Sequence, residues 1–359
     1  MKITLVIVTA LAAFLLGVFR PFYNQDLVAY VAASYQWDGY KGKELSDITY
    51  RTIQNHVSEG KFDELTTGTA ASYSDPAILE KNIPLYSVKV GYLFLLRMTK
   101  LLFGCDYVKA TVLISSIFAA LSVLVLALIL IKEGIGIYFL PAIVLTAGFL
   151  DLARLATPDA VVCFLVLVCV HIIQKRIQVL LILLILPLFR PDSLIISFSL
   201  MGYFFIEGTK LLSVLALMIS LSIYLWEIKN SGNSGWANLF YINFIPHDPS
   251  QLEIPAKPPS LFTYLKIYFE RFCAIGSSGR LTLWIFSICV FVQKKMLKNI
   301  KNEDVVYLLM PLVYVTLHLA YFPNYEQRYF SFTDALLLVW LLKNFKAVAG
   351  SEPERTKRL

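Results

Sequence analysis

The sequence predicts an all-α polytopic membrane protein with about ten transmembrane helices. Of its 359 residues, 57% are hydrophobic and 16% are charged, whereas soluble domains have about 45–50% apolar and about 25% charged residues. The apolar residues come in blocks of roughly 17–25, the length that crosses a bilayer as a helix. We therefore expect residues 1–359 to form a single integral membrane domain.

The first expected element is a span at residues 3–19, which we interpret as uncleaved because no convincing small-residue cleavage site comes after it. Residues 20–107 begin with a polar stretch rich in Tyr, Ser, Thr, Asp and Lys. They predict a long outward loop with short helices at about 25–36 and 44–59.

The apolar run at 84–104 decides the topology of the rest of the chain. It carries Lys89, Arg97 and Lys100, which fall within about 80° of one another on a helix. A cationic stripe on an apolar helix is typical of a helix that lies in the membrane interface. With this helix at the surface, nine further spans are expected, at 108–131, 135–153, 159–174, 177–189, 193–208, 210–228, 281–296, 304–322 and 328–345.

The positions of Lys and Arg support this topology, because cytoplasmic loops carry the excess of positive charge. If 84–104 spanned the membrane, the lysine-rich loops after it would face outward. We therefore expect the protein to lie in the cytoplasmic membrane, with both termini in the cytoplasm. We attribute the net charge of +7 to the orientation of the chain in the membrane and to contact with membrane lipids, and not to nucleic-acid binding. The cytoplasmic set comprises Lys2, Lys132, Lys175, Arg176, Lys210, the run at 294–301, and the tail with Lys343, Lys346, Arg355, Lys357 and Arg358.

The outward set comprises the loop 20–107, three short turns and a second loop at 229–280. The second loop is rich in proline, which favours an extended surface segment, and a helix is expected at 260–274. Cys105 and Cys273 both fall on this side and are candidates for a disulfide, although connectivity does not follow from sequence. The three short turns are 154–159, 190–192 and 323–328.

Each short outward turn carries an arginine, against the charge gradient: Arg154, Arg190 and Arg328. The planar guanidinium binds phosphate through paired hydrogen bonds, so these residues are candidates for holding a lipid phosphate. The alternative is that each pairs with a neighbouring acid. Those acids are Asp151 or Asp159 for Arg154, Asp192 for Arg190, and Glu326 for Arg328.

Three aspartates on the same side are the candidate acids. Asp26 follows the first span, and Asp159 and Asp192 each follow a proline at the start of a span. Asp near a helix N-terminus also stabilises the helix through its dipole and its free amides, so each has a structural alternative. Tyr329, beside Arg328, suits a cavity wall, and His318 is the histidine placed in the outward half of a span.

Sequence motifs of metal sites and of several other enzyme classes are absent. The cysteines and histidines follow no metal-ligand spacing, and no Walker loop, Gly-x-Gly-x-x-Gly or Gly-x-Ser-x-Gly is present. We therefore expect no metal and no cofactor.

The arrangement resembles the GT-C superfamily of membrane glycosyltransferases, distantly those that use dolichyl-phosphate mannose or a polyprenyl-linked aminoarabinose. The resemblance covers the first 200 residues best and rests on the order of its segments and on their common side. These segments are the acid after the first span (Asn24-Gln25-Asp26), the interface helix from Ile83 to Gly104, the turns Arg154 to Ala160 and Phe189 to Asp192, and Gln327-Arg328-Tyr329.

The resemblance implies a polyprenyl-phosphate sugar donor and a lipid-linked or surface glycan acceptor at the outer face of the membrane. Asp26 would act as general base in an inverting transfer, and Arg328, Arg190 and Arg154 would bind the donor phosphate. Asp159, Asp192, Tyr329 and Lys89 would support the site. Family members often have a second acid in the first loop, for which Asp38 and Asp75 are the candidates here.

Two other functions fit the same architecture. A lipid-linked glycan flippase or other transporter would place charges at mid-membrane and often shows inverted repeats. In this sequence the centres of the spans are nearly free of charge. A polysaccharide polymerase would join lipid-linked units by related chemistry.

Overall fold

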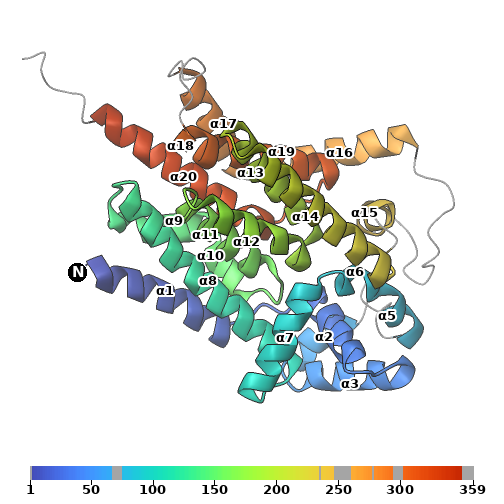
Figure 1. Ribbon diagram of the computed structural model, residues 1–359. Coiled ribbons are helices and arrows are strands. Elements are labelled where there is room, and N and C mark those ends of the chain that lie inside the picture. The colour runs from blue at the N-terminus through green and yellow to red at the C-terminus, as the bar shows by residue number, and fades with distance from the viewer. Residues whose placement is uncertain are drawn as a thin grey trace, which may run out of the picture.

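The computed structural model describes residues 2–66, 75–233, 236–245, 260–276, 279–293 and 302–349, which form helices and connecting turns (Figure 1). Within these ranges there is no β-sheet, only one isolated bridge. Three helices are long and apolar enough to cross a membrane, and a bent pair that meets at 85° would make a fourth. The prediction of an all-α chain is confirmed, and helices of spanning length are present. The three are α1 (Lys2–Phe19), α8 (Tyr107–Lys132) and α14 (Lys210–Ser231), and the bent pair is α16 (Leu261–Gly276) and α17 (Gly279–Gln293).

Several of the other apolar segments form shorter helices than the sequence predicts, whereas the segments expected at 177–189 and 328–345 form helices at least as long as predicted. Several have 10–17 residues, which at 1.5 Å per residue cover about 15–25 Å of a hydrocarbon core about 30 Å thick. Glycine explains one break, because the expected span at 135–153 is divided at Gly148, whose φ is 76°. Pro187 lies inside a helix whose bounds agree with the expected span at 177–189. The helices are η2 (Ile137–Phe139), α9 (Leu140–Thr146), α10 (Phe149–Arg154), α11 (Asp159–His171), α12 (Arg176–Phe189), η3 (Pro191–Ser193), α13 (Leu194–Ile206), α18 (Asn302–Asp304), η5 (Val305–Leu309), α19 (Met310–Tyr321) and α20 (Gln327–Ala349).

The first loop folds into a compact group of helices beside one end of the bundle (Figure 1). The expected helix at 25–36 is confirmed, whereas the one at 44–59 ends at Gln54 and a separate helix begins at Glu59. The expected helix at 84–104 is interrupted near Lys89, whose ψ of 58° is not helical. These helices are α2 (Gln25–Trp37), α3 (Gly42–Gln54), α4 (Glu59–Thr66), α5 (Pro76–Asn82), α6 (Pro84–Ser87) and α7 (Val90–Phe103), and the second loop adds α15 (Trp236–Phe244).

The cationic stripe on α7 contacts protein groups. Nζ of Lys100 lies 2.7 Å from a carboxylate oxygen of Asp38, and Nε of Arg97 lies 3.7 Å from the other. Lys89 faces the aromatic rings of α2 and α6. The stripe therefore attaches α7 to α2, a role that its spacing alone did not predict.

Two close contacts hold the first loop against the bundle. Gly17 of α1 has no room for a side chain, because a Cβ atom there would collide with the carbonyl oxygen of Ala153. Just beyond α1, the amide of Phe22 donates to the carbonyl of Arg154 at 2.8 Å. These contacts bring the beginning of α2 next to the turn that precedes α11.

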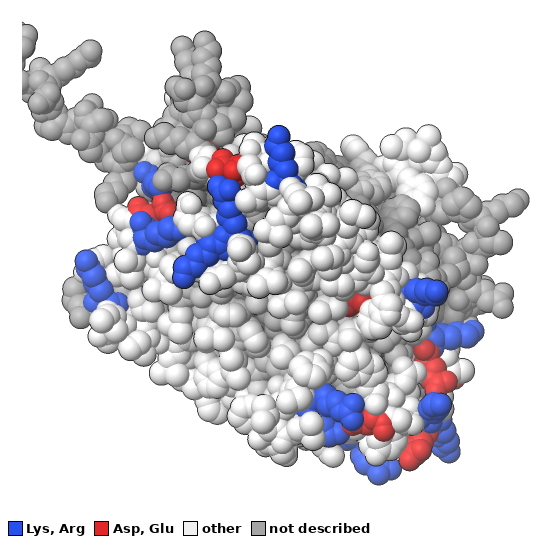
Figure 2. Space-filling model, in the orientation of Figure 1, with Lys and Arg blue, Asp and Glu red and all other residues white. Residues whose placement is uncertain are grey.

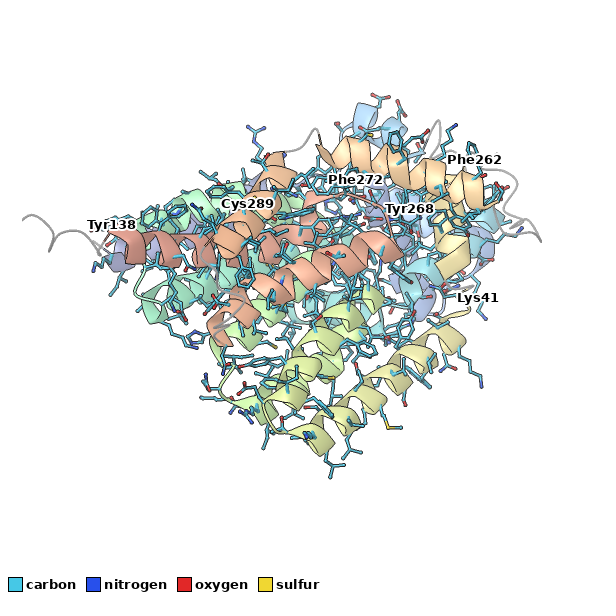
Figure 3. The ribbon with its side chains drawn as sticks, turned by 90° about the horizontal axis from the view of Figure 1, so that it is seen from above. Lys41, Tyr138, Phe262, Tyr268, Phe272 and Cys289 are labelled. Atoms are coloured by element: carbon cyan, nitrogen blue, oxygen red, sulfur yellow. The ribbon has the colours of Figure 1, made fainter. Side chains whose placement is uncertain are left out.

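The surface has the charge distribution of a membrane-associated protein. Figure 2 shows Lys, Arg, Asp and Glu gathered toward two ends of the visible face, with a largely uncharged band between them. Large apolar side chains are exposed on α14, among them Leu211 and Met218. Figure 3 shows Phe262, Tyr268 and Phe272 along α16, and both phenylalanines are exposed.

Some expectations concern residues outside the described ranges or are not met. The lysine run at 294–301, the basic tail beyond residue 349 and the proline-rich part of the second loop at 246–259 lie outside the described residues. Cys105 and Cys273 are both free thiols, so the candidate disulfide is absent from the structure.

Candidate functional site

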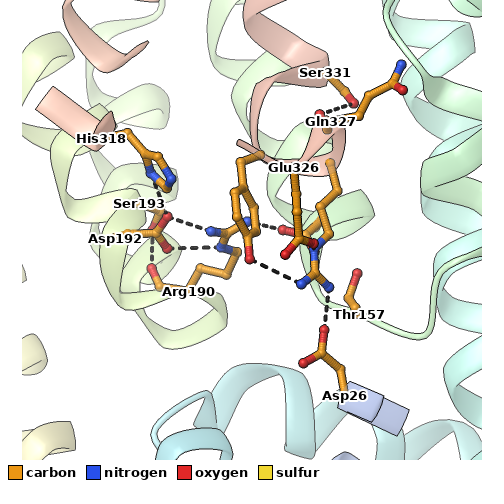
Figure 4. A network of polar contacts seen from close by, with 12 residues as sticks. Asp26, Thr157, Arg190, Asp192, Ser193, His318, Glu326, Gln327 and Ser331 are labelled. Atoms are coloured by element: carbon orange, nitrogen blue, oxygen red, sulfur yellow. Dashed lines mark hydrogen bonds and ion pairs between the residues drawn. The ribbon is translucent and has the colours of Figure 1, made fainter. Parts of the chain in front are cut away.

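A cavity of about 910 Å³ lies where the first-loop helices meet the ends of the bundle helices. Its volume is in the range of about 300–1,000 Å³ that is typical of ligand pockets. Most of the residues that the sequence suggested for the site line this cavity, although they come from five separate segments, and Figure 4 shows the centre of their polar network. They are Asp26, Lys89, Asp159, Arg190, Asp192, Arg328 and Tyr329.

Asp26 lies in the first turn of α2, whose N-cap residue is Asn24. Oδ2 of Asp26 accepts hydrogen bonds from Arg328 and, at 3.0 Å, from Asn24 Nδ2, and Oδ1 accepts one from the hydroxyl of Tyr86 at 3.0 Å. Burial raises the pKa of Asp26, but the charges of Arg328 and Lys89, together with the hydrogen bonds, lower it to about 2. Asp26 is therefore an ionised acceptor held by three donors.

Arg328, at the start of α20, is surrounded by carboxylates. Its Nη1 pairs with Asp26, and its Nε lies 2.6 Å from Oε2 of Glu326 and 3.8 Å from Oδ2 of Asp159. Asp159 also pairs with Arg190. One buried carboxylate at the start of α11 thus joins both arginines of the cavity.

Arg190 forms a forked pair with Asp192, two residues further along the chain. Its Nε and Nη2 donate to the two oxygens of Asp192 at 2.9 and 2.5 Å, the geometry in which a guanidinium binds a carboxylate most strongly. On the other side of Asp192, Nδ1 of His318 lies 3.3 Å from Oδ2 (Figure 4). The local pairings that the sequence offered as alternatives for Arg190 and Arg328 are therefore present.

Tyr329 lies between the two guanidinium groups. The centre of its ring is 4.3 Å from Cζ of Arg190 and 5.0 Å from Cζ of Arg328, and its hydroxyl accepts a hydrogen bond from Arg328 Nη2 at 3.1 Å. Cation–π contact of this kind is worth about 0.5–2 kcal/mol for each group. The ring fixes the relative position of two cations that would otherwise repel each other.

Lys89 differs from both arginines, because in the described part of the chain no carboxylate lies within ion-pair distance of its ammonium group. Nζ donates to the hydroxyl of Tyr30 at 2.5 Å and lies 4.8 Å from the ring centres of Tyr30 and Tyr86. Burial lowers the pKa of Lys89, Asp26 raises it, and the two arginines lower it further, to about 8. Lys89 is therefore a cation that still has capacity for an anionic ligand.

Arg154 lies outside the cavity, unlike the other two predicted arginines. Its Nε donates to the carbonyl of Arg20 at 2.7 Å, and its Nη1 lies 3.9 Å from Asp151. It holds the end of α1 against the end of α10 and is not placed to bind the same ligand as Arg190 and Arg328.

Neither candidate for a second acid in the first loop reaches the cavity. Asp38 binds Lys100 and the hydroxyl of Tyr107, and Asp75 caps α5 through the amide of Ala77. The second carboxylate near Asp26 is instead Asp159, which is linked to it through Arg328.

The sequence did not identify the groups that position Asp26 and Lys89. Tyr30, Tyr86 and Asn24 were given no role, although Tyr86 lies one helical turn before Lys89 and Asn24 lies two residues before Asp26. Among the described residues, no group of three or more His, Cys, Asp or Glu side chains is arranged to hold a metal ion. The acids of the cavity are instead neutralised by arginine.

Comparison with known proteins adds no relative. No protein-family model matches the chain. No curated protein and no solved structure matches it either. The chemistry of the cavity is therefore the basis for assigning a function.

Proposed function

We propose that the protein is a glycosyltransferase of the GT-C type, which transfers a sugar from a polyprenyl-phosphate donor to a lipid-linked or surface glycan. The observation that carries the proposal is the placement of a buried carboxylate, Asp26, and an ammonium group with no carboxylate partner among the described residues, Lys89, in one cavity of about 910 Å³. The transfer needs an acceptor for a proton and a cation for a phosphate leaving group, and these two residues supply them.

Lys89 is the primary contact for the donor phosphate in this proposal. Arg328 and Arg190 are already paired with carboxylates, so their contribution is a preorganised positive field. The hydroxyl of Tyr30 accepts a hydrogen bond from Lys89, so its own proton can be donated to the phosphate. Charge that develops on the leaving phosphate is then stabilised by groups that are in place before reaction.

Asp26 acts as the general base. It takes the proton from an acceptor hydroxyl while that oxygen bonds to the anomeric carbon, and the bond from that carbon to the phosphate oxygen breaks. The configuration at the anomeric carbon inverts, and the lipid phosphate leaves with the bonding electrons. A pKa of about 2 makes Asp26 a weak base while Arg328 is paired with it. A donor phosphate that shares the charge of Arg328 would raise that pKa toward the working range.

The membrane arrangement belongs to the same proposal. Ten spans would place both termini in the cytoplasm and the cavity at the outer face of the cytoplasmic membrane. The exposed apolar faces of α14 and α16 would then contact lipid, and the polyprenyl chain of the donor would stay in the bilayer while its headgroup enters the cavity. The mechanism uses no metal and no cofactor.

The test is consumption of a radiolabelled polyprenyl-phosphate sugar by membranes that contain the protein, with Asp26→Asn as the variant. Turnover by the wild type that is lost in Asp26→Asn supports the transferase and its base. Equal turnover in both would keep the reaction and exclude Asp26 as the base. No turnover with several sugars and crude acceptor would contradict the proposal, and protein-dependent movement of a lipid-linked glycan between leaflets would then identify a flippase.

A further inference from the structure

A second, smaller cavity of about 270 Å³ lies between the C-terminal end of α2, the junction of α6 and α7, and the last two turns of α14. Its volume is just below the range of about 300–1,000 Å³ that is typical of pockets for drug-sized ligands. It therefore suits one small polar unit. No residue of this cavity was assigned a role from the sequence.

The wall of this cavity contains a carboxylate that has no hydrogen-bond partner among the described residues. Glu227 on α14 is 1% exposed, and neither of its side-chain oxygens has a hydrogen-bond partner in the described part of the chain. A buried carboxylate without partners is costly, and native proteins pair such groups almost without exception. The side chain lines the cavity, so a ligand with several hydrogen-bond donors would satisfy it.

The rest of the wall has the composition of a carbohydrate subsite. Trp37 and Trp226 supply aromatic surface, and Gln36, Asn230 and Ser231 supply amide and hydroxyl groups. Aromatic rings offer an apolar face for the C–H groups of a sugar, while the carboxylate and the amides match its hydroxyl groups. A mainly apolar ligand would leave Glu227 unsatisfied.

The small cavity adjoins the large one. Tyr224 and Ile228 of α14 line the large cavity, and Glu227 and Ser231 of the same helix line the small one. In the segment between α6 and α7, Lys89 faces the large cavity and its neighbours Ser87 and Val90 line the small one. The same two segments therefore contribute residues to both cavities.

We infer that the cavity around Glu227 binds one sugar unit of the acceptor glycan, next to the unit that receives the transferred sugar. Glu227 accepts hydrogen bonds from two hydroxyl groups, and the tryptophans pack against the ring. The assignment of this sugar to the acceptor glycan rests on the proposed function, whereas the binding of a sugar by the cavity does not. The two can be tested separately.

The experiment measures the binding of methyl glycosides of glucose, galactose, mannose and N-acetylglucosamine to the purified full-length protein by tryptophan fluorescence, and ethanolamine is the comparison ligand. The variants are Glu227→Leu, which keeps the bulk and removes both oxygens, and Glu227→Gln, which keeps an acceptor without charge. Lys229→Met is the control, because Lys229 is exposed on the same turn of α14 and is not part of the wall. Removal of an unpaired buried acid leaves the melting temperature unchanged or higher, so lost binding is not lost folding.

The expected result is saturable binding of at least one glycoside, weakened about tenfold or more in Glu227→Leu, because a wall built for hydroxyl groups loses its main acceptor. Glu227→Gln should retain part of the binding, and Lys229→Met all of it. If transfer is observed, Glu227→Leu should raise the acceptor KM and leave donor affinity unchanged.

Three outcomes would overturn the inference. They are no glycoside binding by the wild type, equal binding by wild type and Glu227→Leu, and a preference for ethanolamine that is lost in Glu227→Gln, which would identify an ammonium site. Glycoside binding that needs Glu227, without sugar transfer from any donor, would support this cavity and contradict the proposed function. Sugar transfer that needs Asp26 but is unchanged in Glu227→Leu would support the proposed function and contradict the role of the cavity around Glu227.

Discussion

The carboxylate of Asp26 and the guanidinium of Arg328 form an ion pair between residues that are 302 positions apart in the chain. Asp26 belongs to the first helix after α1, and Arg328 belongs to the first turn of α20. Their meeting shows that the cavity is a product of the whole fold. Substitutions at this pair and in its surroundings therefore test the site and the fold together.

Asp26→Asn is expected to lower sugar transfer by about 10²–10⁴-fold, because loss of a general base has effects of that size. The shape of the side chain is kept, and Asn24 and Tyr86 can still contact it. Initial rates with saturating donor, normalised to the amount of folded protein, provide the measurement. Asp75→Asn is the matched control, since Asp75 caps α5 outside the cavity and Asn caps helices equally well. A similar loss in both variants would show that the effect is not specific to the base.

Arg328→Lys is expected to weaken donor binding about tenfold or more, because an ammonium group cannot keep the several carboxylate contacts that hold the guanidinium charge in place beside the phosphate site. The variant keeps a positive charge among Asp26, Glu326 and Asp159, so the fold is spared the unpaired acids that alanine would leave. Equilibrium binding of the donor measures the effect. Arg154→Lys makes the same change outside the cavity and should leave donor affinity unchanged. Equal effects of the two substitutions would remove Arg328 from the phosphate site.

Donor affinity is expected to fall as the pH rises through about 8, because Lys89 then loses the proton that lets it bind phosphate. Lys89→Arg should keep its affinity up to about pH 9.5, since a guanidinium stays protonated there. Unfolding does not explain the loss: the pKa of Lys89 is lower in the folded protein than its usual 10.5, so the unfolded state binds the extra proton between these values and stability rises with pH. The measurement is the donor dissociation constant across this pH range. A parallel decline in both proteins would assign the effect to another group.

Gly148→Ala is expected to destabilise the protein by about 1–2 kcal/mol, since φ at this position is 76° and an L-residue there is strained. A Cβ atom would also collide with the side-chain amide of Gln327, which precedes Arg328. Thermal unfolding in detergent measures the change. Gly202→Ala in α13 is the control, because no described residue lies within 4 Å of its Cβ position. Gly148→Asn should cost less than Gly148→Ala, because Asn tolerates this conformation, and the opposite order would contradict the backbone explanation.

Composition and charge periodicity predicted the helical class and seven of the polar residues that line the cavity. Asp26, Arg190 and Arg328 were found because each stands at the end of an apolar block on the same predicted side. Arg154 was selected by the same criterion, its position at the end of an apolar block. That criterion does not distinguish an arginine that faces the cavity from one that binds the carbonyl of Arg20. That distinction depends on tertiary contacts.

Helix lengths and internal partners were harder to predict. Hydropathy does not show that Gly148 interrupts an apolar segment, so the span expected at 135–153 was too long. The spacing of the cations on α7 predicted a common face for them, but their partners, Asp38 and Tyr30, lie on another helix. Glu227 was overlooked because it reads as the polar end of a span.

The ion pair between Asp26 and Arg328 also sets an order of events during biosynthesis. A ribosome that adds about 5–20 residues per second makes Arg328 about 15–60 s after Asp26, because 302 residues separate them. For most of that interval, the groups of the finished site that are available to Asp26 are those of the first loop, namely Asn24, Tyr86 and Lys89. A nascent chain thus has an incomplete cavity until α20 is made, and the enzyme that we propose would be inactive until α20 packs against the earlier helices.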